Sequence, residues 1–91
     1  MPEATIEISK VTRVDQGAWK IEGNHGLKAW VRDHPVLSKN TFRHFVIAGF
    51  AALFRELSQG ETVSLDEPII AEMMQFPGQA WEVTRVYRPQ P

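Results

Sequence analysis

The chain has 91 residues, of which 43% are hydrophobic and 23% are charged, and these fractions are those of an ordinary globular protein. Ten Lys and Arg residues and eleven Asp and Glu residues give a net charge of −1. This charge argues against binding to nucleic acid or to an anionic membrane through bulk charge, although a local basic patch remains possible. Cysteine is absent, so the sequence excludes a disulfide framework, a thiolate metal site and a thiol nucleophile.

The first third of the sequence predicts an antiparallel meander of three strands, at residues 5–14, 18–22 and 27–31. The alternation of apolar residues slips between Ile8 and Val11, which indicates a β-bulge near Ser9. Gly17 is available for a positive φ in the first turn, and residues 23–26 form the second turn.

Two helices are expected next. The first covers residues 40–58, with Ser38 or Asn40 as its N-cap and Gly60 after its end. The second covers residues 68–75, because two acidic residues and a proline precede an apolar segment there.

Residues 81–88 form the last strand. The resulting fold class is α+β, with a single antiparallel sheet made of the three-stranded meander and the C-terminal strand. One long and one short helix pack on one face of this sheet. We expect residues 1–91 to form one domain.

The predicted long helix is apolar over more than half of its circumference, while a sheet covers only about a third of a helix. The stripe predicted to pack on the sheet includes Phe42, Val46 and Leu53. The remaining apolar surface predicts a contact with another protein or with a second copy of the chain. The expected interface residues are Ile47, Phe50, Ala51, Phe54 and Arg55. The alternative is that the short helix at residues 68–75 covers one flank.

No motif for chemistry emerges from the sequence. The three histidines have neither the helical spacing nor the cysteine partners of a zinc site. Asp33, His34 and Ser38 lie in one loop without the turn that presents a nucleophile, and no glycine-rich phosphate loop is present. We therefore expect no enzyme, no metal and no cofactor.

A second surface combines basic and aromatic residues. Lys28, Trp30 and Arg32 alternate along the third strand, which places them on one face, as in platforms that stack nucleic-acid bases. Further charge on the same side of the sheet is expected from other strands, at Arg13, Lys20, Arg85 and Arg88. The competing interpretation is a solvated sheet face, in which these cations pair across strands with Glu7, Glu22 and Glu82.

The sequence therefore supports two functional hypotheses. The first is a small non-enzymatic protein-binding module: an adaptor, an assembly subunit or a small inhibitor of the kind that phages and plasmids encode. It would form oligomers through the long helix. The alternative is a domain that binds single-stranded nucleic acid on the sheet face. The longest apolar run, residues 45–54, is half the length of a membrane span. The N-terminus lacks the pattern of a secretory signal. We therefore expect a cytoplasmic protein that does not bind membranes.

Overall fold

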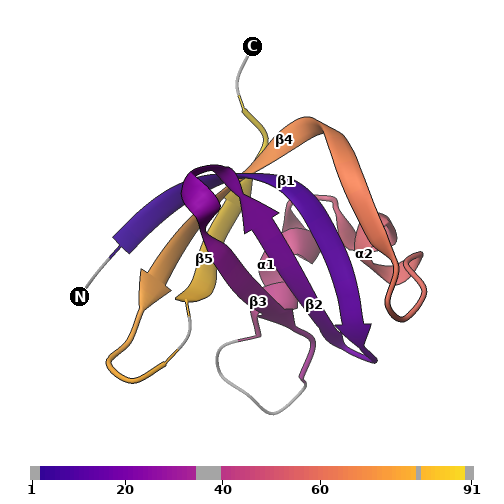
Figure 1. The fold of residues 1–91 in the computed structure, drawn as a ribbon, viewed down its shortest axis with the longest axis horizontal. Coiled ribbons are helices and arrows are strands. Elements are labelled where there is room, and N and C mark those ends of the chain that lie inside the picture. Colours follow the sequence, from indigo (N-terminus) through magenta and orange to yellow (C-terminus); the bar gives the residue numbers. More distant parts are fainter. Residues whose placement is uncertain (1–2, 35–39, 80, 90–91) are drawn as a thin grey trace.

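The computed structural model describes residues 3–34, 40–79 and 81–89. Within them it contains five strands, a 3-10 helix and two α-helices (Figure 1). The elements are β1 (Glu3–Asp15), β2 (Ala18–Gly23), η1 (Asn24–Gly26), β3 (Lys28–Arg32), α1 (Thr41–Ile47), α2 (Ala51–Arg55), β4 (Thr62–Gln75) and β5 (Trp81–Tyr87). The α+β class predicted from the sequence is confirmed.

The five strands close into a barrel in the order β1-β2-β3-β5-β4. The predicted antiparallel meander of β1, β2 and β3 is confirmed. Strand β4 returns to lie antiparallel to β1, which gives the Greek-key order β4-β1-β2-β3. Strand β5 then closes the barrel, antiparallel to β4 and parallel to β3. The sheet thus differs from the predicted one, because it has one more strand and curves into a barrel.

Several local predictions in the first half are confirmed. The register between β1 and its two neighbours shifts between Ile8 and Lys10, where the bulge was expected. Gly17 has a φ of 77° in the first turn. The Asn40 side chain caps α1 by accepting a hydrogen bond from the Arg43 backbone N–H. The alternative cap, Ser38, lies outside the described residues.

The predicted long helix is two short helices, α1 and α2, because the chain turns at Gly49. This residue has a φ of 91°, which side-chain-bearing residues rarely adopt. The Gly49 N–H donates to the Val46 carbonyl at 3.1 Å, and the Phe50 N–H donates to the Phe45 carbonyl at 2.8 Å. These two bonds form a Schellman motif, which ends a helix.

The second predicted helix, at residues 68–75, is wrong, because these residues belong to β4. Alternate side chains, those of Ile69, Ala71 and Met73, are buried, as expected for one face of a strand. Pro68 falls where the register of β4 against β1 jumps, between Ser64 and Ile69. A proline there removes no ladder hydrogen bond.

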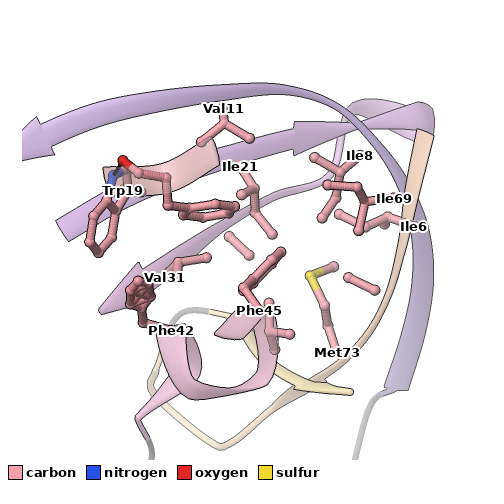
Figure 2. Close-up of a cluster of buried hydrophobic side chains, with 14 of the residues drawn as sticks. Ile6, Ile8, Val11, Trp19, Ile21, Val31, Phe42, Phe45, Ile69 and Met73 are labelled. Carbon is pink, nitrogen blue, oxygen red and sulfur yellow. Dashed lines mark hydrogen bonds between the residues drawn. The ribbon is translucent and has the colours of Figure 1, made fainter. Parts of the chain in front are cut away.

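The core fills the interior of the barrel (Figure 2). Ile6, Ile8, Trp19, Ile21 and Met73 project inward from the strands and meet the aromatic side chains of the helices. The indole N–H of Trp19 donates to the Phe54 carbonyl at 2.9 Å, which joins β2 to α2. Helix α1 packs against β3 and β5 and thereby covers one side of the junction between these strands.

Candidate functional site

The outer surface of β1, β2 and β3 presents the residues that the sequence singled out on the third strand. Along β3, Ala29 and Val31 are buried, so the intervening Lys28, Trp30 and Arg32 lie on the outside. Along β2, burial of Trp19 and Ile21 places Lys20 on the same outer surface.

The strand register brings these outer residues into rows that run across the barrel. In the central row, Thr12 pairs with Lys20, Lys20 pairs with Trp30, and Trp30 pairs with Glu82 of β5. In the next row, Glu22 lies between Lys10 and Lys28. We call the four cations Lys10, Lys20, Lys28 and Arg32, together with Trp30, the platform.

Trp30 is the centre of the platform. Its side chain is partly exposed, and among the described residues it is not one of the partly buried apolar side chains that pack against the core. Trp81, in contrast, packs against the core from β5. The Arg32 guanidinium lies 5.6 Å from the centre of the Trp30 ring, within the range of a cation–π contact. Trp30 therefore contributes little to the core, and its indole is partly exposed on the outer surface of β3.

The lysines of the platform are not part of the surface ion pair between Arg85 and Glu72. One ion pair at the surface joins Arg85 to Glu72, with 3.2 Å between nitrogen and oxygen. Lys10 and Lys28 flank Glu22 in register, yet neither forms a salt bridge with it in the described part of the chain. The pairing that the solvated-face interpretation expected there is not formed.

The other arginines predicted to add charge have different partners. Arg13 donates to the carbonyl oxygens of Leu57 and Arg55, at 2.7 and 3.5 Å, and so holds the chain that follows α2. Arg85 is engaged with Glu72, and the Arg88 guanidinium lies 5.1 Å from the Phe50 ring. Of the four predicted cations, Lys20 therefore joins the platform.

The residues predicted to form a protein interface are divided by the helix break. Ile47 is 75% exposed on α1, while Phe50 and Ala51 are partly buried. Arg55 is exposed, with its guanidinium 5.3 Å from the Phe42 ring. Phe54 is 0% exposed, so the prediction that it lies on a surface flank is wrong. The turn at Gly49 shifts the phase of α2 and directs Phe54 into the core.

Among the described residues, no group of three or more His, Asp or Glu side chains could hold a metal ion. His44 on α1 is partly buried, and its desolvation lowers the pKa, with a further contribution from the positive charge of Arg43. A groove over β4 is lined by Glu72 and Thr84, but both residues are engaged there, since the Thr84 hydroxyl donates to the Glu72 carbonyl.

No family model matches the chain, and comparisons with curated proteins and with solved structures gave no significant match. In the described part of the chain, no helix has the length and apolar character needed to cross a membrane.

Proposed function

We propose that the protein binds single-stranded nucleic acid on the platform, with one base stacked on Trp30 and the neighbouring phosphates held by Lys20, Lys28 and Arg32. The observation that carries this proposal is the position of Trp30, a partly exposed indole outside the core and beside a cation in its own row. Stacking on an exposed aromatic ring requires an unpaired base, which selects single strands over duplexes.

The architecture supports the same ligand class by analogy. OB folds are also five-stranded Greek-key barrels, and they bind oligonucleotides on the face of their second and third strands. In this protein, the platform lies on β2 and β3, with Lys10 added from β1. Since folds host many functions, this analogy strengthens the argument from Trp30 but does not replace it.

Removing the Trp30 ring is expected to weaken binding of a labelled single strand of about 12 nucleotides. Loss of one stacked base costs about 1–3 kcal/mol, so Trp30→Ala should raise Kd about 5- to 150-fold, measured by fluorescence anisotropy. If three cations contact phosphates, log K should fall with log[salt] with a slope of about −2.

Charge reversal supplies the matched control. Lys28→Glu and Arg43→Glu change the net charge equally, but Arg43 is exposed on α1 and is not a residue of the platform. Lys28→Glu should weaken binding, and Arg43→Glu should leave Kd within about twofold. Absence of saturable binding at physiological salt, or equal effects of the two reversals, would contradict the proposal.

The second candidate function is protein binding through α1. The specific observation is Ile47, which is 75% exposed beside Val46, itself 41% exposed. An exposed isoleucine forgoes about 1.5–3 kcal/mol relative to its burial, and a second copy of the chain is the simplest partner that would cover it.

Sedimentation equilibrium tests this candidate. The expected result is a concentration-dependent dimer that Ile47→Glu dissociates, because a charge at the centre of an apolar contact is costly to bury. The control is Ala52→Glu, which adds the same charge at an exposed position of α2. A wild-type protein that stays monomeric at high micromolar concentration would rule out the homodimer.

A further inference from the structure

The first residues of β1 have a neighbouring strand on one side only. Residues 3–8 pair with β4, while the pairing of β1 with β2 begins at Ile8. After Gly23 the chain leaves β2 through η1, and β1 extends past this turn toward its N-terminus (Figure 1). Among the described residues, no strand pairs with the second edge of β1 before Ile8. We call residues 3–6 on this side the open edge.

The backbone of the open edge points outward. The Glu7 N–H donates to the Asn24 side-chain oxygen at 3.0 Å, so it points away from β4 and toward η1. The direction of the hydrogen bonds alternates along an antiparallel strand, so the N–H and C=O groups of Thr5 and Glu3 point the same way as that of Glu7. Both residues are exposed. Each can therefore exchange a pair of N–H···O bonds with an added strand.

The side chains beside the open edge favour a basic partner. Glu3, Thr5 and Glu7 are exposed on the outer surface of β1. An added antiparallel strand would place its own outward side chains opposite these residues, where opposite charges stabilise a pair and like charges destabilise it. A second copy of the chain that paired through the same edge would set Glu3 against Glu7. The charges therefore disfavour a homodimer at this edge.

The groove over β4 adjoins the open edge. Glu3, Ala4 and Thr5 line it from β1, together with Glu72 and Met74 from β4. A long side chain from an added strand thus has space beside β1. Lysine and arginine suit this space, because they can lay their aliphatic part along a surface and keep the charged end in water.

We propose that an extended basic peptide adds to the open edge as a further strand, antiparallel to β1, with lysine or arginine at alternate positions facing Glu3 and Glu7. In such β-augmentation, backbone hydrogen bonds supply affinity and alternate side chains supply specificity. The interaction goes beyond the proposed nucleic-acid binding, because no residue of the open edge belongs to the platform.

The probe is a fluorescein-labelled heptapeptide with blocked ends, in which four lysines alternate with three valines. It should bind saturably in fluorescence anisotropy, and the peptide with glutamate in place of lysine should not bind. Glu3→Gln should raise Kd about two- to fivefold, as expected for loss of one exposed ion pair. Glu56→Gln is the matched control, since this exposed residue follows α2, and it should leave Kd unchanged.

Methylation of the peptide nitrogens separates strand addition from attraction between charges. In the added strand, the lysines that face the open edge donate their backbone N–H groups to β1, while those of the valines point to solvent. Methylating the lysine backbone nitrogens removes at least two hydrogen bonds and should weaken binding at least about fivefold. Methylating the valine nitrogens keeps the same charge and should change Kd by less than about twofold.

The outcomes decide between occupants of the open edge. Equal effects of the two methylations, a Kd that Glu3→Gln leaves unchanged, or no saturable binding at millimolar peptide would each overturn the proposal. A dimer in sedimentation that the peptide dissociates would assign the open edge to a second copy of the chain and would also overturn it. None of these measurements contains nucleic acid, so their failure leaves the function proposed for the platform untouched.

Discussion

Replacing Phe54 by alanine is expected to remove a large part of the stability of this protein. Phe54 is 0% exposed, and its ring centre lies 4.5 Å from that of Phe45, 5.6 Å from that of Trp19 and 6.0 Å from that of Phe42. Truncating a buried phenylalanine costs about 3–5 kcal/mol, against a total of about 5–15 kcal/mol for a typical domain. Urea denaturation should show the loss as a lower midpoint with a similar slope.

The control for this result is Ile47→Ala on α1. Ile47 lost little of its exposed surface on folding, so its truncation should change the free energy of unfolding by no more than about 0.5 kcal/mol. Similar costs for the two variants would contradict the burial of Phe54. A large cost for Ile47→Ala alone would instead indicate that α1 is covered by another molecule.

The second large effect is expected at Gly23, at the end of β2. Its φ of −140° suits any residue, so backbone freedom does not explain the glycine. A Cβ at this position would lie 2.6 Å from the Glu7 carbonyl oxygen of β1. Gly23→Ala must therefore push β1 and β2 apart, and we expect a cost of about 1–3 kcal/mol in urea denaturation.

Gly26 provides the comparison within the same turn. It has a φ of 69°, and no atom lies within 4 Å of the position that a Cβ would occupy. Because asparagine tolerates this left-handed conformation, Gly26→Asn should cost less than about 1 kcal/mol. If Gly23→Ala were no more destabilising than Gly26→Asn, the close approach of β1 and β2 would not limit the side chain at position 23.

The meander was predictable because its signals are local. Alternating apolar residues, the glycine at position 17 and the slip between Ile8 and Val11 each depend on neighbouring residues, and each has the expected structure. The identity of β4 was not recovered from its sequence, because acidic residues before Pro68 mimic a helix start. The alternation of Ile69, Ala71 and Met73 was the signal for a strand.

Part of the candidate site was also predictable. The period of two along β3 places Lys28, Trp30 and Arg32 on one face, as the structure shows. Which residues lie beside Trp30 depends on pairing between distant strands, and no local pattern reports that Glu82 is its neighbour. The helix break had a visible cause in Gly49, since a glycine inside a helix costs about 1 kcal/mol relative to alanine.

The bridge between Trp30 and Glu82 also bears on how ligand binding and folding are coupled. In the described part of the chain, β3 and β5 are joined by this one register pair, whereas the other neighbouring strands share several. Neighbouring strands of the barrel are thus joined by the fewest register pairs at this junction. A nucleotide stacked on Trp30 would bind beside this junction, on its β3 side. By mass action, a ligand bound only to the closed barrel raises the free energy of unfolding as its concentration rises above Kd.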